Sequence, residues 1–340
     1  MSSSTRRSSF PDRPAGPVPV VDIGPALGHD PEAAEEVARH IDVACVSSGF
    51  LLISGHGIDP SLIEEMEATS GRFFDLPLEQ RLESVPSTPG LFRGYSPVAS
   101  NSLAASLDEV VPPDLCEFFC ANRFDDPADA EAAGLRPGRE GFFAPNVWPD
   151  RVPEMADVWG RYYRAMEELS AVLMRLFALA LGLEPGWFDD KVDQHITNLV
   201  VNSYPPQDRP PLPGQLRRGA HTDFGSMTIV HQADGLGGLQ ILGEDGGWVD
   251  VVVPDGAFVV NLGDLMAAWT NDRWVSTMHR VVNPPSESVD RRRLSIAFFH
   301  QPNFDAVVEC LPTCLPAGQE PRYEPVTSGR WLIDKLSKSY

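Results

Sequence analysis

The feature that most constrains this chain is a run of short apolar or alternating segments between residues 195 and 302. Glycine, proline or aspartate separates each segment from the next. Seven segments occur in order: NLVVNSYP, HTDFGSMTIVHQ, GLQILG, WVDVVV, AFVVNLG, HRVVNP and RRLSIAFFHQ. Segments of this length and pattern indicate β-strands, and many short strands at regular spacing predict a sandwich or barrel. We therefore expect a double-stranded β-helix (jelly-roll) core over 195–302.

Helical signals precede this β-rich region. Apolar residues recur every three or four positions over 154–183, and Gly182 supplies a stop, which predicts one long helix. Asp30 and Pro31 have the pattern of an N-cap and a first-turn proline, which predicts a helix over 31–47. The other expected elements are strands at 18–24 and 49–58, a helical stretch over 60–83 and a loop-rich segment over 85–150.

The order of these segments predicts a fold that is mainly β with flanking helices (α+β). We expect a single domain over 17–340, in which helices pack outside the β core. Its parts are an N-terminal mixed region (17–150), the long central helix (154–183), the jelly-roll core (195–302) and a C-terminal segment (303–340). Residues 1–16 are rich in Ser, Arg and Pro, so we expect a disordered tail there.

Charge and composition limit the class of partner. Lys and Arg total 27 against 48 Asp and Glu, a formal net charge of −21, which disfavours nucleic acid and anionic membranes. The long helix is not a predicted membrane span, because arginines and glutamates interrupt it. We expect a small-molecule partner and a chain that is monomeric or weakly homo-oligomeric.

Five cysteines are present, at positions 45, 116, 120, 310 and 314. The chain starts without an apolar secretory stretch, so we expect a cytoplasmic protein with reduced thiols. Cys116 and Cys120, like Cys310 and Cys314, are four residues apart, which raises the possibility of a metal site. Structural zinc sites have tighter spacing, and free cysteines are commonly buried, so we interpret these as buried thiols.

The stretch GAHTDFGSMTIV suggests a metal site. His221 and Asp223 are two residues apart, and alternate residues of a strand point to the same face. His279 follows in STMHRVV, and two histidines with one carboxylate form the facial triad that binds Fe(II) with open positions. The same donors plus water also form a catalytic zinc site, so zinc remains the chemical alternative.

A second pair with the same spacing, Arg293 and Ser295 in RRRLSIAFF, favours iron over zinc. The guanidinium of Arg293 can bind a carboxylate in a bidentate manner, and the hydroxyl of Ser295 adds a donor. A zinc hydrolase has no need for such a carboxylate anchor. Arg291 and Arg292 are alternatives, but Arg292 faces away from Ser295 and Arg291 lies farther along the strand.

Linked motifs over nearly all of residues 17–335 resemble those of a known family. They are VPVVDIG, GFLLISGHGI, NSYPP, HTDFGSMTIV, GLQIL with GWVDV, the long segment AFVVNLGDLMAAWTNDRWVSTMHRVVNP, and RRLSIAFFHQPN. In this order they resemble the isopenicillin N synthase-like family of Fe(II)- and 2-oxoglutarate-dependent oxygenases. The resemblance implies that His221, Asp223 and His279 bind iron and form the catalytic centre. It also implies that four residues bind or adjoin 2-oxoglutarate: Arg293, Ser295, Tyr204 and Asn202.

The resemblance also implies an activity. Such enzymes use O₂ and convert 2-oxoglutarate to succinate and CO₂ while oxidising an unactivated C–H bond. The outcome is hydroxylation, desaturation or cyclisation of a small-molecule metabolite, and we expect a role in bacterial specialised metabolism, such as antibiotic biosynthesis. One alternative is an oxidase of the same family that needs no 2-oxoglutarate, in which Arg293 and Ser295 hold a substrate carboxylate. A more distant one is a zinc hydrolase or a non-catalytic jelly-roll binding protein.

The substrate contacts are less constrained by the sequence. Arg93 and Tyr95 in FRGYSPV, Phe299 and Gln301 are the candidates, with Glu117 as a further possibility. His56 and His231 are interpreted as structural, whereas His195 and His300 stay open. Trp269 and Trp274 are interpreted as packing for the second histidine segment.

Overall fold

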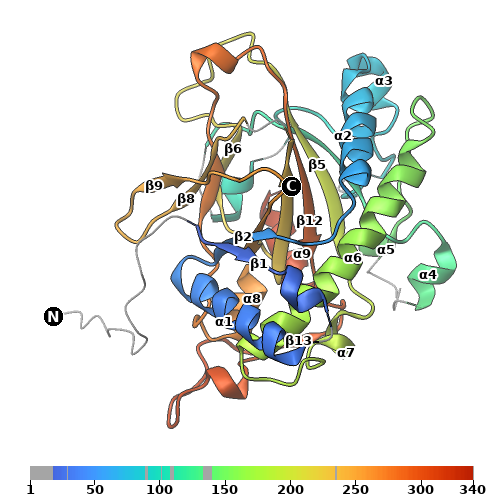
Figure 1. The fold of residues 1–340 in the computed structure, drawn as a ribbon. Helices are drawn as coiled ribbons and strands as arrows, with labels where there is room; N and C mark the ends of the chain where they lie inside the picture. The colour runs from blue at the N-terminus through green and yellow to red at the C-terminus, as the bar shows by residue number, and fades with distance from the viewer. Residues whose placement is uncertain are drawn as a thin grey trace.

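The computed structural model describes residues 18–28, 30–88, 91–100, 102–107, 111–132, 140–233 and 236–339. Its largest sheet has eight strands (Figure 1). The strand order is β1 (Val20–Asp22), β2 (Phe50–Ser54), β10 (Phe258–Leu262), β7 (Met227–Gln232), β12 (Arg293–His300), β5 (Asn198–Tyr204), β4 (Glu117–Ala121) and β3 (Gly94–Ser96). A second sheet has the order β6 (Arg218–His221), β11 (His279–Val281), β8 (Leu239–Leu242) and β9 (Trp248–Asp250). Side chains of both sheets line one cavity, which confirms the expected jelly-roll core.

The strands of the large sheet are buried on both faces because helices cover the face opposite the cavity. On β12, Ile296 and Phe298 pack into the main hydrophobic core, whereas Ser295, Ala297 and Phe299 line the cavity. The covering helices are α1 (Pro31–Ser47), α2 (Pro60–Asp75) and α6 (Met155–Ala180), of which α1 and α2 each pack against α6 (Figure 1).

The helix signals in the sequence are confirmed. Helix α1 begins at Pro31, and the side chain of Asp30 accepts a hydrogen bond from the Glu32 amide at 3.0 Å. Helix α6 ends at Ala180, and Gly182 follows with a φ of +70°, the left-handed conformation that glycine adopts most easily. No helix within the described ranges is long and apolar enough to cross a membrane.

The loop-rich interpretation of 85–150 is wrong in one part. The segment EFFCA forms β4, whose five residues are all buried and pair with β5 from Glu117↔Ser203 to Ala121↔Leu199. Its apolar run is short and lies among prolines, so the strand signal was weak. The helix α9 (Ser328–Ser339) in the C-terminal segment was also not predicted. The predicted disordered tail lies outside the described residues.

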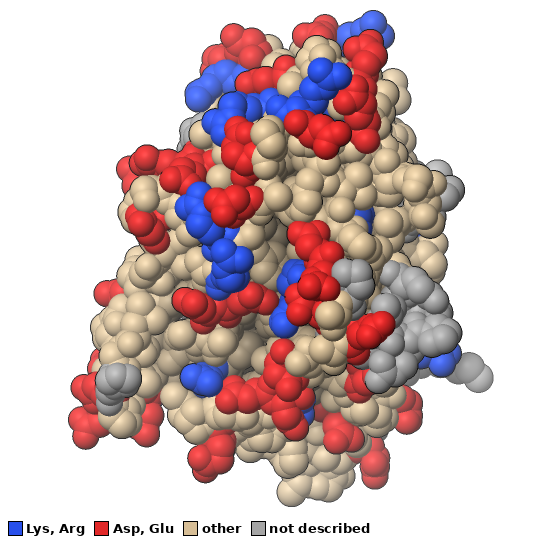
Figure 2. All heavy atoms as spheres, turned by 90° about the vertical axis from the view of Figure 1, so that its right-hand side faces the viewer, with Lys and Arg blue, Asp and Glu red and all other residues tan. Residues whose placement is uncertain are grey.

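Shorter elements complete the described fold. They are η1 (Gly24–Leu27), α3 (Leu78–Leu82), η2 (Leu103–Leu107), α4 (Pro127–Ala132), α5 (Glu140–Phe143), α7 (Asp189–Val192), α8 (Asp264–Trp269), η4 (Ser286–Ser288), β13 (Val307–Val308), η5 (Pro312–Cys314) and β14 (Val326–Thr327). Trp269 and Trp274 are fully buried in the main core, as expected for packing residues. Acidic side chains are spread over the face shown in Figure 2, with basic side chains lying among them.

Candidate functional site

Three of the predicted site residues converge at one wall of the cavity. His221 ends β6, His279 begins β11, and the two residues pair across these strands. Asp223 lies two residues beyond the end of β6, so its side chain is placed by the following turn rather than by strand alternation. Oδ1 of Asp223 is 3.7 Å from Nε2 of His221 and 3.8 Å from Nε2 of His279. All three residues are buried, and their potential ligand atoms lie within 4.8 Å of one another.

The hydrogen bonds of the two imidazoles fix which ring nitrogens carry protons. Nδ1 of His221 lies 2.8 Å from the Gly219 carbonyl, and Nδ1 of His279 lies 3.1 Å from the Thr277 carbonyl. A carbonyl only accepts, so each Nδ1 must donate. In the neutral rings each Nε2 therefore presents a lone pair toward Asp223, the usual arrangement of metal-binding histidines.

Burial and neighbouring charges shift the pKa values of His221 and Asp223 in the directions that metal binding requires. Burial, followed by the neighbouring His279, lowers the pKa of His221 far below its ordinary value, so its imidazole is neutral. For Asp223, burial raises the pKa, but His279, His221 and hydrogen bonds from Asn261 and Thr228 outweigh it and lower the pKa overall. The Nε2 atoms of two imidazoles and one carboxylate oxygen converge here. This donor set fits Fe(II) and leaves coordination positions open.

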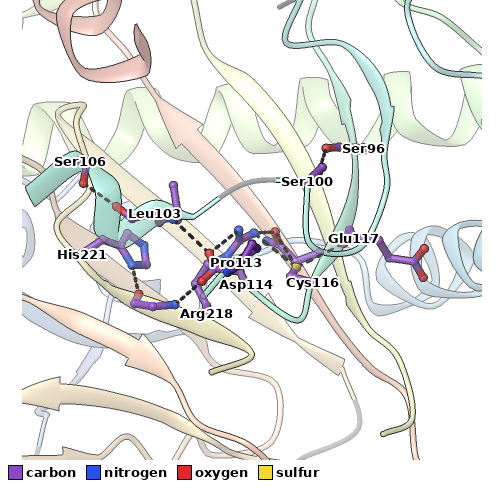
Figure 3. A network of polar contacts seen from close by, with 12 residues as sticks. Ser96, Ser100, Leu103, Ser106, Pro113, Asp114, Cys116, Glu117, Arg218 and His221 are labelled. Carbon is purple, nitrogen blue, oxygen red and sulfur yellow. Dashed lines mark hydrogen bonds and ion pairs between the residues drawn. The ribbon is translucent and has the colours of Figure 1, made fainter. Parts of the chain in front are cut away.

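A buried polar network supports the strand that carries His221 (Figure 3). Oδ1 of Asp114 accepts the Gly219 amide at 2.8 Å, and the carbonyl of the same glycine accepts the His221 ring. Oδ2 of Asp114 accepts the Leu103 amide at 3.2 Å and lies 3.3 Å from the Arg218 guanidinium. Asp114 therefore connects η2, which contributes Leu103 to the cavity, with the strand that carries His221.

The predicted 2-oxoglutarate residues lie together at one end of the cavity. Arg293 pairs with Tyr204 and Ser295 with Asn202 across β12 and β5, and all four line the cavity. The Arg293 guanidinium carbon lies 5.0 Å from the centre of the Tyr204 ring, and its Nε donates to the Gly237 carbonyl at 2.9 Å. A guanidinium, a hydroxyl and a phenol in one buried corner fit a carboxylate.

The alternative arginines point elsewhere. Arg292 binds Asp75 and the Phe74 carbonyl at the end of α2, and Arg291 is exposed. Arg293 is only 2% exposed, so it alone of the three is buried at the cavity.

The four predicted substrate contacts divide into two groups. Phe299 and Gln301 line the cavity, whereas Arg93 and Tyr95 are not among its lining residues. Arg93 is buried and donates to Asn198 and to three backbone carbonyls. The Tyr95 hydroxyl donates to Glu117, which also binds Arg81 and Ser203. The expectation that Arg93 and Tyr95 line the pocket is therefore corrected, because protein groups occupy their polar atoms.

Four further histidines have protein partners outside the cavity lining. Nε2 of His56 contacts the Gly256 carbonyl, His231 contacts Glu67, His195 contacts Glu167, and His300 contacts Ser226. The five cysteines are free, and all except the half-buried Cys310 are buried. In the described part of the chain, only the His221–Asp223–His279 group brings three such ligands together.

Several cavity residues were missed by sequence reasoning. Thr228 and Asn261 bind the metal-site carboxylate, and Leu332 and Leu336 bring α9 to the cavity. Asn261 carries a recognisable signal, a single amide within the apolar strand FVVNL. A buried amide in such a strand needs a polar partner.

Comparison with known protein families covers both halves of the chain. Residues 196–302 match the 2OG-Fe(II) oxygenase superfamily. Residues 18–151 match a family described as the N-terminal region of the non-haem dioxygenase in morphine synthesis.

Individual relatives are similar over almost their full length. A 2-oxoglutarate-Fe(II) type oxidoreductase of Emericella nidulans is 35% identical over 328 residues, covering 95% of this chain and 90% of that protein. Validamycin A dioxygenase of Streptomyces hygroscopicus subsp. limoneus is 30% identical, covering 94% of this chain and 86% of that protein. The crystal structure of a full-length Neurospora crassa protein in complex with alpha-KG and thymine has a TM-score of 0.80 at 31% identity, covering 94% of this chain and 96% of that chain.

Proposed function

This chain belongs to the 2OG-Fe(II) oxygenase superfamily, and we propose that His221, Asp223 and His279 are the ligands of its Fe(II). The convergence of the Nε2 atoms of His221 and His279 on Oδ1 of Asp223 carries this proposal. The protein is a non-haem dioxygenase that uses Fe(II), 2-oxoglutarate and O₂. Iron bound at this site would supply the O₂ activation that is needed to oxidise an unactivated C–H bond. 2-Oxoglutarate is oxidised in the same reaction, as the reductant beside the substrate.

The part of the cavity that contains Arg293, Ser295, Tyr204 and Asn202 is proposed to hold the cosubstrate. Arg293 and Ser295 bind the carboxylate of 2-oxoglutarate that is distant from the metal, and Tyr204 lies beside it. Arg218 donates to Oδ1 of Asn202, which turns the Asn202 amide nitrogen toward the cavity as a further donor. Burial of these groups excludes water and strengthens their interaction with an anion.

The substrate is proposed to be a small-molecule metabolite that is hydroxylated, desaturated or cyclised. The cavity is lined largely by apolar and aromatic side chains with a few polar groups, the arrangement that is typical of small-molecule sites. Validamycin A dioxygenase, whose name specifies a small molecule, and the thymine complex of the Neurospora crassa protein support this class. A role in bacterial specialised metabolism is part of the proposal, and the Streptomyces relative supports it.

An anaerobic titration tests the proposal. Fe(II) and then 2-oxoglutarate are added to the metal-free protein, and the weak visible charge-transfer absorbance of the chelate is recorded. We expect the band in the wild-type protein, its loss in Arg293→Ala, and its retention in the matched control Arg292→Ala.

Two outcomes would contradict parts of the proposal. Iron binding without a 2-oxoglutarate band would contradict the cosubstrate role of Arg293 and Ser295 and favour a substrate-carboxylate anchor. Tight binding of zinc with no binding of Fe(II) would contradict the metal assignment itself.

A further inference from the structure

Asn198, at the end of the cavity opposite Arg293, has its amide orientation fixed by a buried arginine. The four cavity residues of β5 are Asn198, Val200, Asn202 and Tyr204, so Asn198 is the most distant from the cosubstrate corner. Oδ1 of Asn198 accepts a hydrogen bond of 2.8 Å from Nη1 of Arg93. A guanidinium only donates, so the amide oxygen must face Arg93 and the NH₂ group must point away from it.

Arg93 is itself held rigidly, which makes this orientation stable. It is 4% exposed, and three more of its five N–H groups reach the carbonyls of Phe92, Phe142 and Ala144. Reversing the Asn198 amide would place an NH₂ group against this buried guanidinium and leave a donor unsatisfied, which is costly. Arg93 therefore acts from behind the cavity wall, as a positioning residue for Asn198.

The NH₂ group of Asn198 is left available to a ligand. Asn198 is 7% exposed and lines the cavity, and its Nδ2 makes no hydrogen bond to any residue that the structure describes. A donor that is nine-tenths buried and opens into a cavity requires water or a ligand as its acceptor. The same strand repeats the arrangement at Asn202, whose oxygen is held by Arg218 at the cosubstrate end.

The surroundings of Asn198 are apolar and aromatic. Phe299 lies directly opposite on β12, and Phe92 and Phe118 line the same region with ring centroids 5.4 Å apart. Leu332 of α9 also reaches the cavity. Among the described lining residues, the charged groups other than the metal triad are Arg218 and Arg293. Both belong to the Asn202–Tyr204 part of the wall, so the cation next to Asn198 is Arg93, which lies behind the wall and bonds to the amide oxygen.

We propose that Asn198 is a specificity-determining residue whose NH₂ group donates a hydrogen bond to a carbonyl oxygen of an uncharged, ring-bearing substrate. This inference rests on the proposed function and specifies its substrate class. A carboxylate at this position would be buried beside aromatic rings and would meet only the neutral NH₂ group, because Arg93 is outside the cavity lining and donates to Asn198 and to backbone carbonyls. A carbonyl needs no counter-ion. The aromatic side chains provide the stacking and apolar surface that orient a ring system.

Matched probes test this chemistry without knowledge of the natural substrate. The probe pairs are 1-indanone with indane, and 1-tetralone with tetralin, in each of which a carbonyl group replaces one methylene group. Their binding to the full chain, loaded with Fe(II) and 2-oxoglutarate under anaerobic conditions, is measured by ligand-detected NMR. The wild-type protein is expected to bind each carbonyl probe roughly tenfold more tightly than its hydrocarbon partner, as one hydrogen bond allows.

Variants isolate the Asn198 donor. Asn198→Val removes it, and Asn198→Asp replaces it with an acceptor that can pair with Arg93, so both are expected to abolish the carbonyl preference. Asn271→Asp makes the same change at an equally buried asparagine outside the cavity lining, and the preference should persist there.

The outcomes separate this inference from the proposed function. The inference is overturned if the wild-type protein binds neither probe, binds both partners equally, or keeps its preference in Asn198→Val. The chelate absorbance is recorded on the same samples before the probes are added. A wild-type band without carbonyl preference overturns this inference alone, whereas absence of the band overturns the proposed function and the inference together.

Discussion

Nδ2 of Asn261 lies 2.6 Å from Oδ2 of Asp223, so the amide of one strand holds the carboxylate that faces both histidines. Oγ1 of Thr228 donates to the same oxygen at 2.5 Å. These two bonds occupy Oδ2 and leave Oδ1 directed at His221 and His279. The carboxylate is thereby prepared to bind a metal through one oxygen, which leaves more of the coordination sphere open.

The Thr228 hydroxyl should therefore support metal binding without contacting the metal. Thr228→Val removes one of the two bonds to Asp223 at nearly constant volume, and we expect Mn(II) affinity to fall about tenfold. Equilibrium titration followed by electron paramagnetic resonance measures the affinity. Thr270→Val is the matched control, because Thr270 is equally buried and bonds only to backbone carbonyls and an amide. Equal affinities in Thr228→Val and Thr270→Val would contradict this role.

Asp114 should be important for stability. Its carboxylate satisfies the Gly219 and Leu103 amides and faces Arg218, all in the interior (Figure 3). Asp114→Asn removes the charge beside a buried guanidinium and sets an NH₂ group against donors, so the free energy of unfolding should fall by about 3 kcal/mol. Urea unfolding measures this change. The control Glu83→Gln breaks a solvent-exposed pair with Arg151 and should leave unfolding nearly unchanged. A similarly small change in Asp114→Asn would refute the assigned role.

His300 should make the protein sensitive to acid. Burial, and then the nearby His195, lowers the pKa of His300 well below its ordinary value near 6.5. The unfolded chain takes up a proton at this position below about pH 6.5 while the folded chain does not, so stability falls as the pH falls. This single group contributes a slope of up to about 1.4 kcal/mol per pH unit.

The variant His300→Gln cannot titrate and should show a shallower loss of stability. The free energy of urea unfolding is measured between pH 7.5 and 5, and only its slope is compared, because the substitution can also change stability by a constant amount. Parallel slopes for wild type and variant would show that His300 does not titrate in this way.

The sequence was most informative where a residue type in a given pattern has one common structural role. Asp30 followed by Pro31 marked the start of α1 correctly, and His221, Asp223 and His279 lie together, although Asp223 lies beyond β6 and not on its strand face. Because alternate residues of a strand face opposite sides, the sequence favoured Arg293 over Arg292 as the cavity residue. The structure places the two side chains on opposite faces. The capping pattern of α1 and the alternation along β12 act within a few residues, whereas His279 is distant in the sequence from the other two members of its group.

Relationships over long sequence separations were not predictable in the same way. Arg93 was expected at the substrate, but its guanidinium is bound by Asn198, 105 positions away, and by the segment near Phe142. Thr228, Asn261 and the leucines of α9 reach the cavity through tertiary packing that no local pattern encodes. Strand β4 was missed because its short apolar run is surrounded by turn residues.

Metal stoichiometry in Asp223→Ala tests the central claim most directly. The wild-type protein and the variant are titrated with Fe(II) under anaerobic conditions, and circular dichroism confirms that the variant is folded. The account predicts one Fe(II) per wild-type chain and loss of that binding in the folded variant. A folded Asp223→Ala protein that binds one Fe(II) with wild-type affinity would contradict it.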